Sequence, residues 1–171
     1  MVNLSDIEVK NRLALLLQEQ STMTLATAEN GIAWAAPVYF VNIEHHFYFF
    51  SAPESRHIRE AESARQAAAA IYAQTAGWQD IRGVQMSGTV QPVGVGIEAS
   101  RMIAAYLKKF SFVRDFFQPR QPVTLRSFAN AFKARFYCFA AQRIFYLDNQ
   151  VAFGFRQEVA LTEKGGGEDR R

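Results

Sequence analysis

The sequence predicts a mainly β protein in which about six antiparallel strands form a barrel with helices at its periphery. Fifteen Phe, six Tyr and two Trp among the 171 residues, mostly in short runs, indicate a β-rich interior or a large buried interface. Several segments alternate polar and apolar residues and are joined by short turns, which is typical of antiparallel strands. Only a few helical segments interrupt them, so the pattern favours an antiparallel barrel over a doubly wound parallel sheet.

The first half of the chain is expected to form a helix, a hairpin, a third strand and a second helix. Ser5 and Glu8 form a capping box ahead of an amphipathic segment. Asn30 and Gly31 tolerate positive φ and separate two alternating segments, so they predict a β-hairpin. The expected elements are a helix at 5–20, strands at 21–28, 32–41 and 47–51, a turn at 42–46 and a helix at 58–65.

The second half is expected to supply further strands and two more helices. Four alanines leave residues 66–73 compatible with a strand or a helix, and the strand is the preferred interpretation. Two prolines indicate a loop over 111–124. The expected elements are strands at 66–73, 81–92, 134–140, 143–148 and 151–155, a loop at 74–80, and helices at 98–109 and 125–133. The strands at 134–140 and 143–148 are expected to form the closing hairpin.

Composition and charge restrict the class of protein. The chain has 19 Lys and Arg against 16 Asp and Glu, a net charge of +3, which does not indicate a nucleic-acid partner. It has no signal-peptide pattern and no apolar run of membrane-spanning length, so we expect a cytoplasmic protein without a membrane partner. Cys138 is expected to be a buried, inert thiol. Residues 1–162 are expected to form one domain, and residues 163–171 a disordered tail.

Residues 49–57 are the most informative stretch for function. Phe50 and Ser51 end an aromatic strand, and Ser55, Arg56 and His57 precede a predicted helix. Hydroxyl and backbone N–H groups at a helix N-terminus donate to phosphate oxygens, and a guanidinium neutralises phosphate charge. The same local pattern also fits an ordinary helix cap with a solvated arginine, so both interpretations stay open.

With this element order, the chain resembles the FMN-binding split-barrel proteins, the pyridoxamine 5′-phosphate oxidase-like superfamily, over residues 5–157. Three stretches carry the resemblance: Phe50-Ser51 followed by Ser55-Arg56-His57, residues 81–88, and the ending from 144–149 through 153–155. Together with residues 82–85, the ending resembles a small bacterial branch of that superfamily. The resemblance implies a six-stranded split barrel and a homodimer that holds FMN in the groove between its subunits.

The resemblance also implies roles for individual residues. Arg56 corresponds to the principal phosphate ligand, and His57 stands where the family often has Lys. Gln85 would reach the polar edge of the flavin ring, and backbone groups near Val38 and Tyr39 would run beside it. The implied cofactor-binding residues are Val38, Tyr39, Phe50, Ser51, Ser55, Arg56, His57 and Gln85.

The chain departs from pyridoxamine oxidases at three places. Residues 34–41 contain no cation where those enzymes have Arg and Lys, their C-terminal Trp and Arg have no counterpart, and their Gln position is Gly83 here. These differences argue against a pyridoxal-phosphate substrate. The implied function is an FMN-dependent oxidoreductase that acts on another small molecule with an external electron donor. The alternative is a non-catalytic flavin- or haem-binding or sensing module, since the superfamily also includes haem-handling and deazaflavin-binding members.

Other polar and aromatic residues have less specific interpretations. His45 and His46 are expected to point to opposite sides of an extended chain, so no metal site is expected. Trp34 and Trp78 fit flavin-stacking, core or dimer-contact roles. Basic residues interleaved with Phe over 108–135 resemble a single-strand nucleic-acid surface. The nearly balanced total charge instead favours a solvated helix and a hydrophobic subunit contact there.

Overall fold

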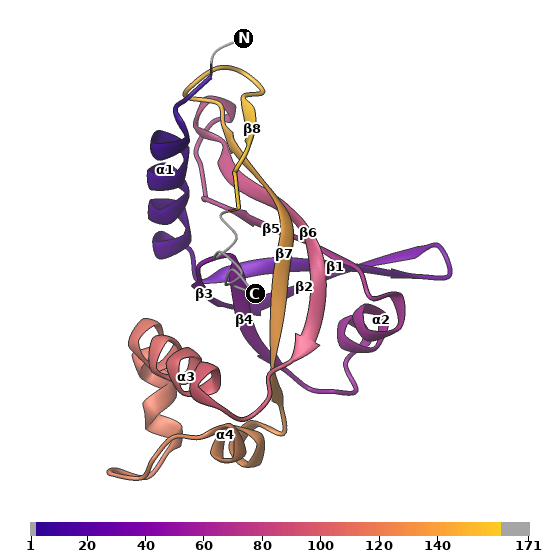
Figure 1. Ribbon diagram of the computed structural model, residues 1–171, viewed down its shortest axis with the longest axis vertical. Coiled ribbons are helices and arrows are strands. Elements are labelled where there is room, and N and C mark those ends of the chain that lie inside the picture. Colours follow the sequence, from indigo (N-terminus) through magenta and orange to yellow (C-terminus); the bar gives the residue numbers. More distant parts are fainter. Residues whose placement is uncertain (1–2, 162–171) are drawn as a thin grey trace, which may run out of the picture.

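The computed structural model of the protein describes residues 3–161, which form eight strands, four α-helices and two 3-10 helices (Figure 1). The strands are β1 (Thr22–Glu29), β2 (Ile32–Tyr39), β3 (Val41–Ile43), β4 (His46–Ser51), β5 (Ala67–Tyr72), β6 (Arg82–Pro92), β7 (Arg135–Asp148) and β8 (Arg156–Glu158). The helices are α1 (Asp6–Glu19), α2 (Arg56–Ala64), η1 (Trp78–Asp80), α3 (Ile97–Lys109), η2 (Ser111–Phe116) and α4 (Leu125–Phe132). The expected tail at 163–171 lies outside the described residues.

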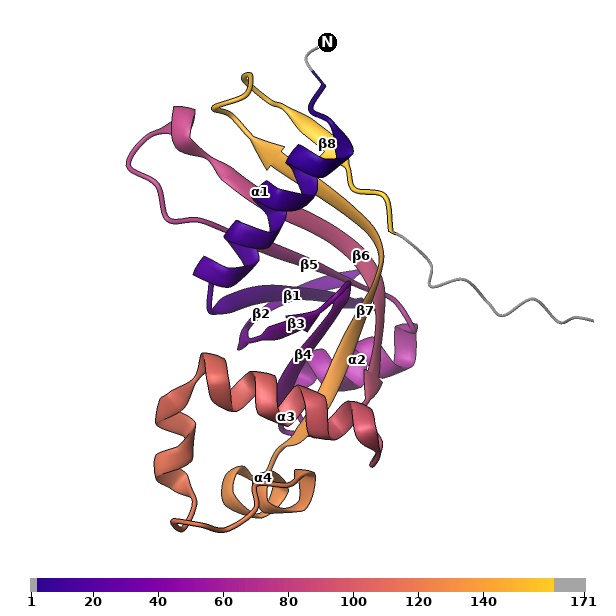
Figure 2. The same cartoon turned by 60° about the vertical axis from the view of Figure 1, so that its left-hand side comes forward.

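All eight strands belong to one antiparallel sheet. Its order is β2-β1-β5-β6-β7-β4-β3, and β8 pairs with β7 beside this path. The sheet curls into a half-barrel with helices at its periphery, as Figures 1 and 2 show, so the predicted mainly β class is confirmed. The expected number of six strands is wrong. Val41–Ile43 pairs with His46–Tyr48 and forms β3 where a turn was expected, and β8 is a further short strand.

The expected closing hairpin is also wrong, because β7 is one continuous strand of 14 residues. Ser87 of β6 pairs with Arg143 and Gly88 pairs with Ala141, so Gln142 is the extra residue of a β-bulge. A bulge interrupts the polar–apolar alternation much as a turn does. The predicted strand at 151–155 is a turn, in which Val151 N–H donates to Asp148 and Phe155 N–H donates to Ala152.

Helices α1 and α2 pack on the concave face of the sheet. The buried side of α1 consists of Val9, Leu13, Leu16 and Leu17, which follow its helical period. They join Ile58 and Ala61 of α2 and the inward residues of the strands in one hydrophobic core. The capping box of Ser5 and Glu8 is confirmed, so the first helix begins where the sequence predicts.

A second hydrophobic cluster lies under residues 93–134, which we call the helical lobe. Helix α3, η2 and α4 cover the outer face of β3, β4 and the first half of β7 (Figure 2). Tyr106, Phe128 and Phe136 form its buried centre, with ring centroids 4.7–6.1 Å apart. Lys109 joins the lobe to α1, because its ammonium donates to Leu17 O at 3.1 Å and lies 4.0 Å from the Phe40 ring. Burial lowers the pKa of Lys109 to about 8.

The rest of the outer face carries small side chains that remain exposed or half-buried. Register places these residues side by side on β2, β1, β5 and β6. We call this surface the open sheet face, which consists of Thr24, Ala26, Ala33, Ala35, Pro37, Ala68, Ala70 and Gln85. A sheet whose two faces differ in this way leaves a mostly apolar surface of small side chains uncovered in a single copy.

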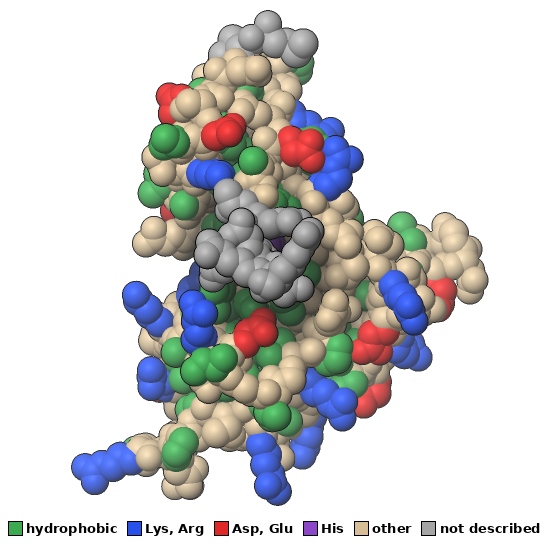
Figure 3. Space-filling view, viewed as in Figure 1, with side chains coloured by type: hydrophobic (Ala, Val, Ile, Leu, Met, Phe, Trp, Pro, Cys, Tyr) green, Lys and Arg blue, Asp and Glu red, His purple; other side chains and the backbone are tan. Residues whose placement is uncertain are grey.

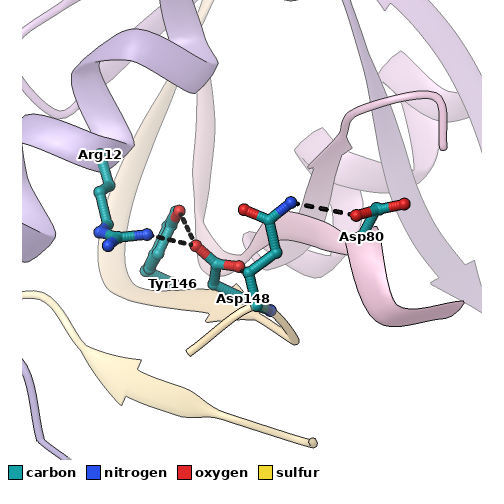
Figure 4. Close-up of polar contacts among 5 residues, drawn as sticks. Arg12, Asp80, Tyr146 and Asp148 are labelled. Carbon is teal, nitrogen blue, oxygen red and sulfur yellow. Dashed lines mark hydrogen bonds and ion pairs between the residues drawn. The ribbon is translucent and has the colours of Figure 1, made fainter. Parts of the chain in front are cut away.

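A buried carboxylate ties α1 to the end of β7 (Figure 4). The Asp148 side chain is only 2% exposed and accepts hydrogen bonds from Arg12 Nη1 and Tyr146 OH, both at 2.9 Å. Gln150 N–H donates to its other oxygen at 3.0 Å, and the Gln150 side chain reaches Asp80. Burial and the hydrogen bond to Asp148 raise the pKa of Tyr146 to about 12. Each oxygen of the Asp148 carboxylate is therefore hydrogen-bonded inside the protein.

Within residues 3–161, none of the helices has both the length and the apolar composition that a membrane-spanning helix needs.

Candidate functional site

The residues predicted to bind phosphate lie in the connection from β4 to α2 and at the start of α2. Ser55 is the N-cap of α2, with φ −64° and ψ 145°, yet within the described chain its side chain makes no capping hydrogen bond. The Ser55 carbonyl accepts from the backbone N–H groups of Ile58 and Arg59 at 3.1 and 3.2 Å. The Ser55 hydroxyl is therefore free to face the end of β4 instead of the first turn of its own helix.

Three side chains converge at this helix N-terminus. Ser51 Oγ lies 3.1 Å from Ser55 Oγ and 2.8 Å from His57 Nε2, and Ser55 Oγ lies 3.3 Å from the same nitrogen. All three residues are half-buried. Burial lowers the pKa of His57, and the charge of Glu60 partly opposes this shift. The ligand-free site thus presents two hydroxyls and a neutral imidazole within hydrogen-bonding distance of one another.

Arg56 points away from this cluster. Its Nε donates to Glu60 Oε1 at 2.5 Å, and its guanidinium carbon lies 4.5 Å from the centre of the Trp34 ring. Glu60 is buried and also accepts from Thr27 Oγ1 at 2.6 Å, and these two hydrogen bonds lower its pKa. Arg56 therefore braces α2 against the β1–β2 hairpin. It also lines an open cavity of about 500 Å³ with Arg59.

Sequence reasoning missed Thr27 and Glu60. The spacing of Arg56 and Glu60, four residues apart on a predicted helix, was an available signal for their ion pair. The local sequence holds no signal for Thr27, which comes from a strand far away in the chain.

Three other predicted residues lie in or beside hydrophobic clusters. Phe50 packs in the lobe against Tyr106, Phe128, Phe132 and Phe136, with ring centroids 5.3–6.0 Å apart. Val38 is buried in the core of the barrel. Tyr39 is 48% exposed, and its ring contacts those of Phe110 and Phe112. The side chains of Phe50 and Val38 are thus committed to packing.

Gln85 is exposed on the open sheet face, far from the cluster at α2. It pairs with Phe145 of β7, whereas Ser51 pairs with Arg135 of the same strand. The ten positions between these β7 residues correspond to roughly 30 Å along a strand. The structure therefore brings Ser51, Ser55 and His57 together, with Arg56 adjacent, and leaves Gln85 apart from them.

A second polar cluster lies where β4 meets the helical lobe. His46, Glu98 and Cys138 line a cavity of about 240 Å³, and Tyr48 OH donates to Glu98. Burial raises the pKa of the half-buried Cys138 to about 12, so this thiol stays protonated.

The rings of His45 and His46 stack with their centroids 4.8 Å apart, although they were expected to point to opposite sides of an extended chain. The chain is not extended here, because Glu44 has a positive φ of 56°. Within residues 3–161, no group of three His, Cys, Asp or Glu side chains is placed to hold a metal ion.

The two tryptophans lie at the surface, Trp34 on the edge strand β2 and Trp78 in η1. Trp34 is 43% exposed beneath Arg56. Trp78 is 57% exposed and contacts Phe153, with ring centroids 5.4 Å apart. Both rings keep a large accessible surface in a single copy, so neither is a core residue, and the dimer-contact and flavin-stacking roles stay predictions.

A family model described as pyridoxamine 5′-phosphate oxidase matches residues 9–137, most of the chain. The comparison with curated proteins found no match. Among solved structures, a haem-binding protein from Mycobacterium smegmatis is similar, with a TM-score of 0.65 and 18% identity. That likeness covers 92% of this chain and 59% of the other protein, so this chain spans about three fifths of its length.

Two further structures are similar over most of both chains. A FAD-binding protein from Mesorhizobium loti has a TM-score of 0.58 and 16% identity, over 78% of this chain and 90% of the other. A haem storage protein from Vibrio cholerae has a TM-score of 0.63 and 15% identity, over 80% of this chain and 93% of the other. At these identities, the likenesses establish a common fold.

Proposed function

Because this chain belongs to the pyridoxamine 5′-phosphate oxidase family, we propose that it is an FMN-binding homodimer that catalyses a redox reaction of a small molecule. The observation that carries this proposal is the convergence of Ser51, Ser55 and His57 at the N-terminus of α2. Hydroxyls, an imidazole and first-turn N–H groups fit the oxygens of a phosphate monoester. When bound, the isoalloxazine ring supplies the redox chemistry, and the protein binds and orients it.

The open sheet face supports the homodimer. Its small apolar side chains allow a second copy to approach closely, and burying such a surface favours association. Gln85 and Ser51 pair with residues of β7 that are separated by roughly 30 Å measured along this curved strand, so they lie on different parts of the sheet. In this proposal, one copy therefore holds the phosphate and the other copy supplies Gln85 to the polar edge of the ring.

The substrate is a small molecule other than pyridoxamine 5′-phosphate. Residues 34–41 carry no cation, and the exposed positions of β2 are Ile, Ala, Trp, Pro and Tyr side chains, so this strand offers no charged partner for a substrate phosphate. The cationic residues near the cluster include Arg56, the first residue of α2, and Arg135, which pairs with Ser51 on the neighbouring strand β7. Arg56 neutralises buried Glu60, so a substitution of Arg56 would also disturb α2. Substitutions of Ser51, Ser55 and His57 therefore test the phosphate site more directly.

A side-by-side titration with FMN and riboflavin tests the proposed site. The native protein is expected to bind FMN more tightly than riboflavin. The Ser51→Ala/Ser55→Ala double variant should weaken FMN binding roughly thirtyfold, about 2 kcal/mol for the lost hydrogen bonds to a charged group, and leave riboflavin binding unchanged. Ser63→Ala, at the exposed far end of α2, is the matched control. Equal binding of both flavins by the native protein would reject the phosphate site.

FMN affinity is expected to rise as the pH is lowered from about 8 to about 6. The pKa of His57 is below its ordinary value of 6.5, so the ligand-free imidazole is neutral at pH 7. A phosphate dianion favours the imidazolium and raises this pKa, so binding takes up a proton. Fluorescence titrations at several pH values measure the effect, which riboflavin should not show. His57→Asn should remove the pH dependence and His46→Asn should retain it; a pH-independent FMN affinity contradicts the assignment of His57.

A non-catalytic haem- or flavin-binding module is the second candidate. His46 lines a cavity beside stacked His45, and a histidine is a common haem ligand. The common fold of a haem-binding and a haem storage protein adds to this reading. Haemin added in the same titration series distinguishes the candidates, since a Soret shift that His46→Ala abolishes favours haem. Bound FMN that a nicotinamide donor cannot bleach favours a flavin store or sensor.

A further inference from the structure

A groove lies in the helical lobe, away from the proposed FMN site. It encloses about 610 Å³ between α3 and residues 114–126. Its floor includes Ala99, Ile103 and Leu107 of α3, which are 4–7% exposed, and Val123 and Leu125 face it from the other side. This volume lies in the usual range for small-molecule sites, and the floor is apolar, as such sites require.

Two guanidinium groups give this apolar groove a charge preference. Arg114 and Arg126 line it, and neither forms an ion pair with any residue in 3–161. No acidic residue is among the described residues that line the groove. An unpaired guanidinium beside an apolar floor fits a carboxylate attached to a hydrocarbon.

The helical lobe as a whole is positively charged, as are the two arginines of the groove. Residues 93–134 contain seven Lys and Arg against two Asp and Glu, a net charge of +5, whereas the whole chain has +3. Figure 3 shows Lys and Arg side chains over its lower part, where the lobe lies. One of the two acidic groups, Glu98, accepts a hydrogen bond from Tyr48. The lobe thus attracts anions although the rest of the protein does not.

The groove runs along most of the length of α3. Its α3 side runs from Gly96 to Leu107, which corresponds to about 16 Å along a helix. This length is comparable with that of an extended laurate chain. Val95 and Ile97 are 94% and 82% exposed where α3 begins, so a ligand with an alkyl chain would find additional apolar surface there.

We propose that this groove binds a medium-chain fatty carboxylate, with the alkyl chain along α3 and the carboxylate held by Arg114 and Arg126. The floor provides the apolar contacts, and the two guanidiniums select an acid over the corresponding alcohol. This site is separate from the cluster at α2, so it operates whether or not FMN binds there.

Calorimetric titration of the full chain with laurate below its micelle concentration tests the proposal. Laurate is expected to bind at least tenfold more tightly than dodecanol. Arg114→Gln and Arg126→Gln should each weaken laurate binding about tenfold, which is the size of one lost charge-assisted contact. Arg101→Gln, an exposed arginine on α3 that does not line the groove, is the matched control and should bind as the native protein does. Ala104→Trp, which fills the groove from its exposed rim, should abolish binding.

Three results overturn the proposal. The first is equal affinity for laurate and dodecanol, and the second is an equal loss of laurate binding in Arg101→Gln and in the two groove arginine variants. The third is a changed sedimentation coefficient in Ala104→Trp with unchanged laurate binding, which would mean that a second copy of the chain covers the groove. FMN titration of the same variants should match that of the native protein, so failure here is distinguishable from failure of the FMN site.

Discussion

Replacing Gly88 with alanine is expected to lower the free energy of unfolding by about 3 kcal/mol. A Cβ atom at this position would lie 2.1 Å from the carbonyl oxygen of Ala140 and 2.9 Å from its carbon. The obstructing atoms belong to the backbone of β7, an interior strand paired on both sides, so they cannot move aside as a side chain can. The β6–β7 register changes at this same glycine. The substitution must therefore separate the two strands or displace the bulge.

Urea denaturation followed by circular dichroism measures this effect. Gly94→Ala is the matched control, because no atom lies within 4 Å of a Cβ built there. The control is expected to unfold at the native urea concentration or slightly above it. Equal midpoints for Gly88→Ala and Gly94→Ala would mean that β6 and β7 are not in close contact at the bulge.

Arg12→Met is expected to lower the free energy of unfolding by about 2 kcal/mol. This variant keeps the apolar stem of the side chain and removes the guanidinium that faces buried Asp148. Removal of one partner leaves the other charge uncompensated in the interior, which is strongly destabilising. The hydrogen bonds from Tyr146 and Gln150 remain, so we expect an effect below that of a completely isolated charge.

The matched control is Arg143→Met, which removes the ion pair between Arg143 of β7 and Glu158 of β8. Both Arg143 and its partner Glu158 are more than half exposed, so no measurable change is expected. A double variant, Arg12→Met with Asp148→Asn, should recover part of the lost stability because it removes the unpaired charge. If Arg12→Met unfolded at the same urea concentration as Arg143→Met, the buried carboxylate would not depend on its arginine.

Most elements could be predicted because their signals are local. The capping box at Ser5 fixes the start of α1, and Asn30-Gly31 fixes the first hairpin. The errors occur where two structures produce the same local pattern. At Gln142 a bulge and a turn interrupt the alternation equally, and only the pairing with β6 distinguishes them. The alanines of β5 had no clear pattern, and their strand conformation follows from β1 and β6 on either side.

In the candidate site, too, the features set by neighbouring residues could be predicted and those set by distant contacts could not. Residues 51, 55 and 57 are close in sequence, and a strand end followed directly by a helix start brings them together. The direction of the Arg56 side chain depends on Glu60, Thr27 and Trp34, two of which come from the β1–β2 hairpin. The local motif therefore predicted that residues 51, 55 and 57 lie together, but it could not predict that distant contacts turn the Arg56 side chain away from them.

The position of β7 in the sheet has a consequence for synthesis of the protein. This strand lies between β6 and β4, so it joins two parts of the sheet that were translated long before it. Until residues 135–148 leave the ribosome, β4 and β6 each have one edge whose backbone N–H and C=O groups are unpaired. The aromatic side chains of β4 also lack the β7 side chains against which they pack. Nascent or truncated chains that end before β7 would therefore be prone to aggregate and in need of chaperones.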